Sequence, residues 1–452
     1  MTLPPAPLHL IRLLETAGFS AYVVGGCVRD ALLGQCPGDW DLSTSAQPEQ
    51  ACAVLRAAGV TVHETGLQHG TITAAIDHKP YEITTFRLDS AYTDHRRPDA
   101  VEFTDDLRAD LSRRDFTVNA MAFHPARGLA DPFHGQQDLR DKTIRCVGEP
   151  ALRFGEDALR ILRGLRFAST LGFAIESKTA EAILVSRETI LHVAAERIQA
   201  ELTKLLCGQN TRRVLLDYRE VIFTALPQLR ALSGFDQRTP WHCYDIWEHS
   251  CAAVEAVPPS PALRWAALLH DSGKPECFFM RGGTGHFHGH PQRSERVARE
   301  ICDQLKFSRR LKERVLTLVA NHELRLLDEA PNPVRLRRLL GKFGKEVLLE
   351  LIDLMRADAC AQAPEKRAFR LENYEPMRRA VRALVQQNSC VARKQLAVTG
   401  RDLIPLGLQG PRLGQALDRL LEEVLEGRLP NEREALLRWA QQNNFLDNST
   451  KI

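Results

Sequence analysis

One short segment near the start of the sequence, AYVVGGCVRDALLGQCPGDWDLSTS (21–45), constrains the fold more than any other part of the chain. An apolar, β-branched run ends at Gly25 and Gly26, and a helical pattern begins near Val28, so backbone N–H groups at a helix start can face an anion. Asp39 and Asp41 follow two residues apart, which places both carboxylates on one face of a strand. Two carboxylates that close repel each other unless a cation lies between them. This order predicts a site for phosphate and a metal ion.

A third carboxylate, Glu82, lies in the strand-like segment YEITTFR (81–87) and could reach the same site from a neighbouring strand. Mg²⁺ binds carboxylate oxygens together with substrate phosphates. Two such ions orient a triphosphate and lower the pKa of an attacking hydroxyl. Taken singly, each of these residues is consistent with a surface aspartate or a turn glycine. Taken together and in this order, they favour phosphoryl transfer.

The pattern of apolar residues changes along the chain. Alternating, β-branched segments such as TITAAID (71–77) come early, and from about Ala151 onward the apolar spacing is helical almost throughout. The sequence therefore predicts an α+β chain, a small mixed sheet followed by helices. Its 452 residues exceed one ordinary domain, and a hydrophobic content of 44% with 26% charged residues is typical of folded proteins.

Several whole-chain features bear on location and partners. The sequence begins without a basic leader followed by an apolar stretch and has no window of about 18 uncharged apolar residues, which predicts a cytoplasmic protein that does not span a membrane. Eleven cysteines without a CxxC pair predict reduced thiols. Net charge is only +3, but the stretch 306–345 holds eleven Lys and Arg against four Asp and Glu. That stretch is either a set of solvated helix faces or a surface for RNA phosphate.

The early motif is similar to the signature of the class II nucleotidyltransferases, which comprise the bacterial CCA-adding enzymes and the related poly(A) polymerases. The similarity continues through RRPDAVEFTDDLRADLSRRDFTVNAMAF, GLADPFHGQQDLRDKTIRCVG, RFGEDALRILRGLRFA and AAERIQAEL, and covers most of the first 205 residues. The resemblance implies that Asp39 and Asp41 hold catalytic Mg²⁺ and that Glu82 completes the carboxylate set. It also implies that one group of residues binds the triphosphate and ribose: Gly25, Gly26, Arg29, Arg114, Asp115 and Asn119.

The segment EDALRILRGLRF (156–167) places Glu156, Arg160, Arg163 and Phe167 along one helical face, with Asp157 beside them. By itself this stripe is consistent with a solvated face carrying ion pairs. The family pattern implies instead that Asp157 and Arg160 read the incoming base and that Arg163 belongs to the nucleotide site. A carboxylate acceptor and a guanidinium donor pair with cytosine and adenine, whereas guanine and uracil would leave buried polar groups unpaired at roughly 1–3 kcal/mol each.

Histidines and aspartates recur over successive predicted helices in the second half of the chain. His270 and Asp271 follow the apolar run ALRWAALL, where an unpaired carboxylate is costly and a divalent ion compensates. His242 and His286 are interpreted as core or surface residues. The order resembles the HD superfamily of metal-dependent phosphohydrolases. That resemblance implies a first metal shell of His249, His270, Asp271 and Asp358, for Mn²⁺, Ni²⁺ or Mg²⁺, and phosphate or second-metal contacts from Lys274, His290 and His322.

The resemblances together imply four domains. These are a nucleotidyltransferase head (1–145), a helical nucleotide-binding neck (146–215), an HD-type helical body (216–375) and a helical tRNA-binding tail (376–452). In the tail, Gly407, Gly410 and Gly414 are equally consistent with close approach to phosphate and with helix caps.

The implied activity is template-independent addition of CCA to tRNA 3′ ends from CTP and ATP, with a second, phosphohydrolase activity in the HD-type body. The segment RLDSAYTDHRRPDAVEF (87–103) matches the flexible loop of CCA-adding members rather than the altered loop of CC-adding ones. Alternatives are an A-adding enzyme, a poly(A) polymerase, or an HD phosphohydrolase whose head binds RNA without catalysis. Intact Asp39, Asp41 and Glu82 argue against the last.

Overall fold

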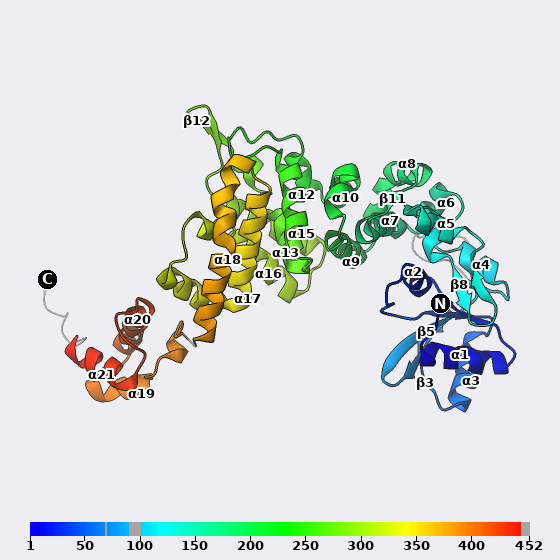
Figure 1. Cartoon of the computed structure of the whole chain (residues 1–452), viewed down its shortest axis with the longest axis horizontal. Coiled ribbons are helices and arrows are strands. Elements are labelled where there is room, and N and C mark those ends of the chain that lie inside the picture. Colours follow the sequence, from blue (N-terminus) through cyan, green and yellow to red (C-terminus); the bar gives the residue numbers. More distant parts are fainter. Residues whose placement is uncertain (68–69, 90–100, 388, 444–452) are drawn as a thin grey trace. The chain divides into compact units, whose positions relative to one another are not determined.

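The computed structural model describes residues 1–67, 70–89, 101–387 and 389–443 and divides into two compact units (Figure 1). The first unit comprises Met1–Arg230 with Asp303–Phe307, and the second comprises Ala231–Cys302 with Ser308–Ile452. Across the described residues, none of the helices combines the length and the apolar character needed to cross a bilayer. All eleven cysteines are free thiols, as the sequence predicts.

The first unit is built on a seven-stranded sheet. Its strands follow the spatial order β3 (Thr61–Gly66), β4 (Thr71–Ile76), β5 (Lys79–Thr85), β2 (Leu42–Thr44), β1 (Ala21–Val24), β8 (Ala122–His124) and β9 (Gly128–Ala130). The β2–β5 pair is parallel, with Leu42 opposite Ile83, and the other neighbours are antiparallel. The mixed sheet at the start of the chain is therefore confirmed.

Two helices, α1 (Pro5–Thr16) and α3 (Pro48–Ala57), contact each other and the sheet (Figure 1). They bury apolar side chains at helical spacing, including Leu10 and Leu14 of α1 and Leu55 of α3. Shorter helices carry the connections: α2 (Gly26–Leu32), α4 (Leu107–Ser112) and α5 (Gly135–Arg140). The segments that bear the predicted site residues are thus attached to the packed sheet and helices.

Helices follow the sheet: α6 (Pro150–Glu156), α7 (Leu159–Leu171), α8 (Ser177–Val185), α9 (Ala195–Leu206), α10 (Thr211–Asp217) and α11 (Arg219–Ala225). The single helix predicted across residues 156–167 is wrong, because it breaks between α6 and α7 at Asp157. Asp157 adopts φ −140°, and its Oδ1 accepts a hydrogen bond of 3.0 Å from Leu159 N. This cap competes with the helical conformation and starts a new helix.

The second unit is mainly helical. Its elements include α12 (Ile246–Ala256), α13 (Pro261–Leu269), α14 (Lys274–Cys277), α15 (His290–Gln304), α16 (Arg309–Ala320), α17 (Pro333–Cys360) and α18 (Pro364–Gln386). Helix α12 packs on α13 and α17, and α13 also packs on α16. Sequence periodicity missed two short strand pairs after residue 142, β10 (Thr143–Ile144) with β11 (Ala174–Ile175) and the hairpin of β12 (Phe279–Arg281) and β13 (Thr284–His286).

The last helices, α19 (Gly400–Leu403), α20 (Pro411–Leu425) and α21 (Arg433–Gln442), surround an apolar cluster that includes Leu403, Leu420 and Leu436. Gly407 has φ +87° at a helix end and Gly410 has φ +55° at the start of α20, so both serve as helix caps. The four predicted domain boundaries stay a prediction. Strands β6 (Arg87–Asp89) and β7 (Val101–Phe103) pair at the base of the predicted flexible loop, whose residues 90–100 lie outside the described part.

Candidate functional site

The turn between β1 and α2 explains the first glycine of the motif. Gly25 has φ +78°, and a Cβ at this position would lie 2.7 Å from Nη1 of Arg114. Its N–H donates to the carbonyl of Met121 at 3.0 Å, which ties the turn to the segment before β8. Helix α2 begins at Gly26, so its first amides face outward without partners inside the helix. Only a glycine allows this close approach of turn and guanidinium.

The three predicted carboxylates gather at the adjoining strands. Asp39 and Asp41 lie in the extended segment just before β2 rather than within the strand, and Asp41 O accepts from Val24 N at 3.0 Å. The parallel β2–β5 register brings Glu82 beside Asp41. Partial desolvation raises the pKa of Asp41, although its side chain remains solvent-accessible, and repulsion from Glu82 and Asp39 raises it further. Negative charge is therefore in excess here, which suits a divalent cation.

The next residues form one hydrogen-bonded chain behind the turn. The Arg163 guanidinium donates from Nε to Asp115 Oδ2 at 2.7 Å, and Asn119 Nδ2 donates to Asp115 Oδ1 at 3.3 Å. Arg29 Nη1 donates to Asn119 Oδ1 at 2.6 Å. Burial alone would raise the pKa of Asp115, but Arg163 and these hydrogen bonds hold it below its usual value. Four predicted nucleotide-binding residues are thus brought together from three segments.

Arg114 lies near both Asp115 of this hydrogen-bonded set and the carboxylate of Asp41. Its guanidinium is 3.7 Å from Asp110 Oδ2 and 3.5 Å from Ser43 Oγ. Burial lowers the pKa of Arg114, and Asp110, Asp115 and Asp41 act in the opposite direction. The residue therefore supplies a positive charge next to Asp41 and Gly25, where a triphosphate would need one.

The two predicted base-reading side chains are held firmly by neighbours. Asp157 Oδ2 lies 3.1 Å from Arg197 Nη2 of α9. Arg160, which is buried, donates from Nη1 to Glu156 and from Nη2 to the carbonyl of Arg113 at 3.0 Å. Sequence reasoning left Glu156 and Arg197 out of the site. The signal was present, since both belong to the quoted family motifs.

These groups line one cleft of about 470 Å³ within the first unit. Its lining includes all the predicted nucleotide-binding residues: Gly25, Gly26, Arg29, Arg114, Asp115, Asn119, Asp157, Arg160 and Arg163. Asp41 also lines it, whereas Asp39 and Glu82 lie outside the lining. The ring of Phe167 carries three guanidinium groups on it, those of Arg29, Arg163 and Arg166, at 4.0–5.5 Å. The cleft combines carboxylates, stacked arginines and a glycine turn.

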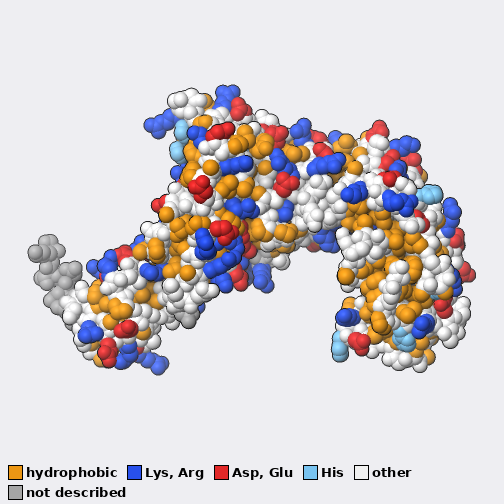
Figure 2. Space-filling view, in the orientation of Figure 1, with side chains coloured by type: hydrophobic (Ala, Val, Ile, Leu, Met, Phe, Trp, Pro, Cys, Tyr) orange, Lys and Arg blue, Asp and Glu red, His pale blue; other side chains and the backbone are white. Residues whose placement is uncertain are grey.

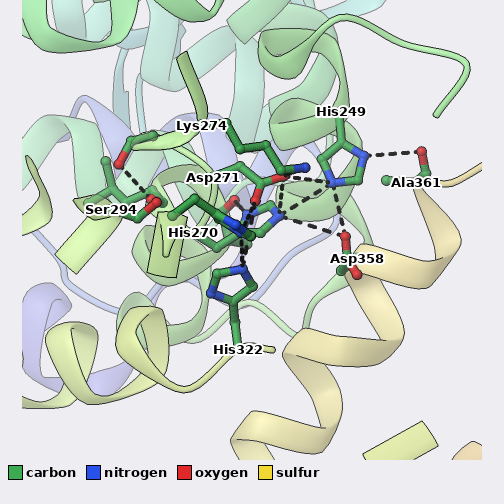
Figure 3. Close-up of polar contacts among 12 residues, drawn as sticks. His249, His270, Asp271, Lys274, Ser294, His322, Asp358 and Ala361 are labelled. Atoms are coloured by element: carbon green, nitrogen blue, oxygen red, sulfur yellow. Dashed lines mark hydrogen bonds and ion pairs between the residues drawn. The ribbon is translucent and has the colours of Figure 1, made fainter. Parts of the chain in front are cut away.

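A second cluster lies in the other unit, where His249 of α12, His270 and Asp271 after α13, and Asp358 of α17 converge (Figure 3). Their ligand atoms lie within 4.8 Å of one another. A second set, Asp271 with His290 and His322, shares the Asp271 carboxylate. Among the described residues, only these two sets bring three or more such atoms this close. All the predicted HD ligands are therefore assembled.

The hydrogen bonds of the four histidines decide which ring nitrogen faces the cluster. In each ring Nδ1 lies against a backbone carbonyl, at 3.2, 2.8, 2.9 and 2.7 Å for His249, His270, His290 and His322. A carbonyl only accepts, so Nδ1 carries the proton and Nε2 is left as a lone-pair donor to a cation.

The Nε2 atoms face one another in pairs, at 3.3 Å for His249 and His270 and at 3.0 Å for His290 and His322. Two lone pairs at that distance repel unless one of the nitrogens carries a proton or a cation lies between or beside them. The donor set of imidazole nitrogens and carboxylates suits a divalent transition ion. The residues present therefore fit a metal.

The two carboxylates give the cluster an excess of negative charge, which favours either a metal ion or, without one, a proton on His270. Burial lowers the pKa of His270, but Asp271 and Asp358 outweigh it and raise it to about 10. Lys274, predicted as a phosphate contact, is buried and lies 2.7 Å from Asp271 Oδ2 and 2.8 Å from Gln237 Oε1. Lys274 therefore forms a buried ion pair with Asp271.

A cavity of about 390 Å³ opens onto the cluster. His242 and His286, interpreted from sequence as core or surface residues, both line it, and the ring of His242 packs 4.8 Å from that of His249. Burial together with Lys274 lowers the pKa of His242 to about 2. Neutral His242 therefore belongs to the wall of the cavity.

The basic stretch 306–345 has many of its charges offset inside each unit. Arg309 pairs with Glu313 at 2.7 Å, and Arg314 pairs with Glu350 at 2.7 Å. Arg338 reaches two glutamates of the tail, at 2.5 and 2.8 Å. These pairs favour the interpretation of solvated, internally paired helix faces.

Comparison with known proteins matches this geometry along nearly the whole chain. The family model "Poly A polymerase head domain" matches residues 21–145, "Probable RNA and SrmB-binding site of polymerase A" matches 172–231, and the model for tRNA nucleotidyltransferase domain 2 matches 290–440. The CCA-adding enzyme of Bacillus cereus (strain Q1) is 33% identical, covering 97% of this chain and 98% of the relative.

Two further relatives agree. The CCA-adding enzyme of Lacticaseibacillus paracasei is 33% identical over 96% of this chain and 94% of its own length. The solved structure of the Bacillus stearothermophilus CCA-adding enzyme, in complex with CTP, superposes with a TM-score of 0.72 at 30% identity, covering 98% of both chains. Because this similarity extends over nearly its whole sequence, the chain belongs to the family of CCA-adding enzymes.

Proposed function

We propose that the first unit adds the sequence CCA to tRNA 3′ ends, taking CTP and ATP as substrates without a nucleic-acid template. The observation that carries this proposal is a shared cleft. Asp157 and Arg160 line it together with Gly25, Arg29 and Arg114, the residues predicted to bind the triphosphate. Similarity to CCA-adding enzymes over 97% of the chain supports the tRNA substrate.

The reaction is an in-line displacement at the α-phosphorus. The terminal hydroxyl oxygen of the RNA forms the new bond to phosphorus, and pyrophosphate leaves with the electrons of the broken bond. Asp39 and Asp41, with Glu82 beside them, would hold Mg²⁺, which would acidify the hydroxyl and orient the triphosphate. Arg114 and Arg29 offset phosphate charge, and the glycine turn lets the backbone approach the phosphates closely.

Base choice follows from the fixed positions of two side chains. The Asp157 carboxylate accepts a hydrogen bond from an exocyclic amine, and the Arg160 guanidinium donates to an unprotonated ring nitrogen, a pattern that cytosine and adenine share. Glu156 and Arg197 hold these groups in place, so they are positioning residues.

Asp157→Ala and Arg160→Ala are expected to reduce discrimination of CTP over UTP by about 5- to 100-fold. In the wild-type chain a wrong base leaves these polar side chains without a hydrogen-bond partner, and each variant removes one of the side chains that impose this penalty. Incorporation of CTP itself should fall much less, since the carboxylates at β2 and β5 are untouched. Steady-state kcat/KM for all four nucleotides on one tRNA measures this. Arg213→Ala on the exposed side of α10 is the control. Equal losses for all four nucleotides would contradict base reading.

The choice among CCA addition, A addition and poly(A) synthesis is tested with four RNAs. These are tRNA lacking its end, tRNA ending in C, tRNA ending in CC, and an unstructured RNA, each with CTP, ATP or both. The proposal expects C, C and A in order on the tRNAs and little addition to the unstructured RNA. Addition of A alone to the CC end, with C never incorporated, would identify an A-adding enzyme, and long A tails would identify a poly(A) polymerase.

A second activity is proposed for the other unit: hydrolysis of phosphate esters at RNA ends by a divalent-metal site of the HD type. The observation that favours it is the pair of facing Nε2 contacts, which prepares four histidines as ligands around the shared Asp271. A bound divalent ion would supply an activated water. When water forms the new bond to phosphorus and the P–O3′ bond breaks, hydrolysis of a 3′-phosphate or a 2′,3′-cyclic phosphate would restore the free 3′-hydroxyl that the first unit needs as nucleophile.

A further inference from the structure

Exposed aromatic side chains are confined to one region of the described chain. Of its Phe, Trp and Tyr residues, only Trp241, Phe279 and Phe369 are exposed, with 41%, 39% and 44% of their surface accessible. Trp241 and Phe369 line the cavity of the second unit, and Phe279 lies on the β12–β13 hairpin that contributes His286 to it. Exposed aromatic side chains that gather at one polar cavity are candidates for a binding role.

The backbone of Trp241 is held against the helix that carries Phe369. The carbonyl of Trp241 accepts from Ala363 N at 2.9 Å, which ties it to the start of α18, the helix that also carries Phe369. Lys366 Nζ lies 5.6 Å from the Trp241 ring centroid. Trp241 and Phe369 therefore lie close to the first turns of α18, and both line the cavity.

The hairpin adds a second, stacked surface. The ring of Phe279 stacks on that of His286 at 5.4 Å with an interplanar angle of 25°, and His286 stacks on His288 at 5.8 Å and 22°. Both histidines line the cavity. Figure 2 shows histidine and apolar side chains together on the surface at this hairpin, whose position is labelled β12 in Figure 1.

The same cavity has a floor of different chemistry. Asp271, His290, His322 and Asp358 lie there as the proposed metal ligands. Arg370, next to Phe369 in the chain, also lines the cavity, lies 3.7 Å from Asp358 Oδ2 and donates to Gln362 Oε1 at 3.1 Å. Planar apolar rings at the rim, cations in the wall and metal ligands at the floor match the parts of a nucleotide, from base to phosphate.

We infer that Trp241 and Phe369 form a base-stacking rim, which holds the nucleobase of a nucleoside phosphate while its phosphate reaches the metal ligands. The inference rests on the proposed phosphohydrolase function for the chemistry of the ligand. Stacking does not read hydrogen-bonding edges, so all four bases are accepted, with the larger purines favoured. The nucleoside phosphate is either the last residue of an RNA or a free nucleotide, and the two share this recognition.

The test compares Trp241→Ala and Phe369→Ala with the full-length wild-type chain loaded with Mn²⁺. On adenosine 2′,3′-cyclic phosphate, each variant is expected to raise KM by about 5- to 100-fold, the size of losing one base–aromatic stack, with kcat within about twofold. Hydrolysis of glycerol 1,2-cyclic phosphate, which lacks a base, should not change. Trp241→Phe should restore most of the affinity. Met280→Ala, exposed at 44% on the hairpin but outside the cavity lining, is the matched control.

A binding measurement separates this inference from the proposed hydrolysis. Calorimetric titration with the slowly hydrolysed adenosine 2′,3′-cyclic phosphorothioate should show the same affinity loss in both alanine variants. If the wild-type chain binds the analogue through these rings but hydrolyses no phosphate ester, the phosphohydrolase proposal fails and the rim stands. Unchanged binding in both variants, or an equal KM increase for the substrate without a base, overturns the rim. A higher kcat/KM for an oligonucleotide ending in a cyclic phosphate than for the mononucleotide identifies an RNA end as the ligand, and the reverse identifies a free nucleotide.

Discussion

Asp41→Asn is expected to reduce incorporation of both CTP and ATP into tRNA by at least about 10²–10³-fold, the loss that follows removal of one strong electrostatic contact in the transition state. Asp41 is the carboxylate that lines the cleft, with Glu82 and Asp39 next to it. Asparagine keeps the shape of the side chain but removes the charge that a metal ion needs. Single-turnover incorporation on tRNA ending in CC, with ATP, measures the effect directly.

The fold should survive this substitution. Asp41 is repelled by two neighbouring carboxylates, so removing its charge relieves repulsion, and thermal unfolding should occur at the wild-type temperature or slightly above it. Asp77→Asn is the control, because Asp77 is exposed in the β4–β5 turn with φ +50°, a conformation that asparagine tolerates. Wild-type incorporation by a folded Asp41→Asn protein would remove Asp41 from the catalytic set.

Asp271→Asn is expected to abolish hydrolysis of 2′,3′-cyclic phosphate ends, by at least about 10²–10³-fold, while leaving CTP and ATP incorporation unchanged. Its carboxylate belongs to both ligand sets, so both would lose a charged ligand. Inorganic mass spectrometry of the purified protein should show reduced bound Mn²⁺ or Ni²⁺. Hydrolysis assays with Mn²⁺, Ni²⁺ and Mg²⁺ measure the activity in parallel.

A second variant distinguishes loss of the ligand set from loss of the fold. Asp271→Asn leaves the buried Lys274 ammonium without its partner, and breaking such a buried pair costs about 3–5 kcal/mol. Asp358→Asn avoids this, since the Asp358 side chain is 22% exposed, and it should lose hydrolysis as well. Glu276→Gln, exposed on α14, is the control with a carboxylate outside the cluster. Folded variants that hydrolyse as fast as wild type would show that the cluster is structural.

The Asp271→Asn and Asp358→Asn variants also test whether nucleotide incorporation by the first unit depends on hydrolysis. Hydrolysis and incorporation are proposed to use separate ligand sets in separate compact units. A variant that has lost hydrolysis should therefore still incorporate nucleotides into tRNA with a free 3′-hydroxyl. It should fail to do so only when the starting tRNA carries a phosphate at its 3′ end. A double assay on both tRNA forms tests the proposed order of the two reactions.

Local sequence pattern was sufficient for the features that depend on neighbours in the chain. The alternating segments before residue 100 predicted strands β1, β4 and β5 of the mixed sheet, because side chains on a strand alternate between its faces, whereas β3, β8 and β9 were not predicted. Gly25 was identified from its place between a strand and a helix, and its φ of +78° gives the physical reason. The ordered motifs from 21 to 202 identified the family, which the comparisons confirm.

Local pattern failed where a polar side chain competed with helical spacing. The apolar period across residues 156–167 is continuous, but Asp157 caps Leu159 and breaks the helix. That break leaves Glu156 at the end of α6, from where it holds Arg160 of α7. Periodicity reports which residues share a face, and it does not report a cap that ends one helix and starts the next.

The sequence by itself determined the α+β class, the family and the set of residues able to bind phosphate and metal, because these depend on residue type and order. Only the tertiary structure decided how those residues meet. It paired Nε2 atoms of histidines 21 and 32 residues apart, placed the Lys274 ammonium on Gln237, and brought Trp241 and Phe369 to the lining of one cavity. Such contacts join helices that are distant in the chain, and their geometry is set by packing of the whole core rather than by any local period.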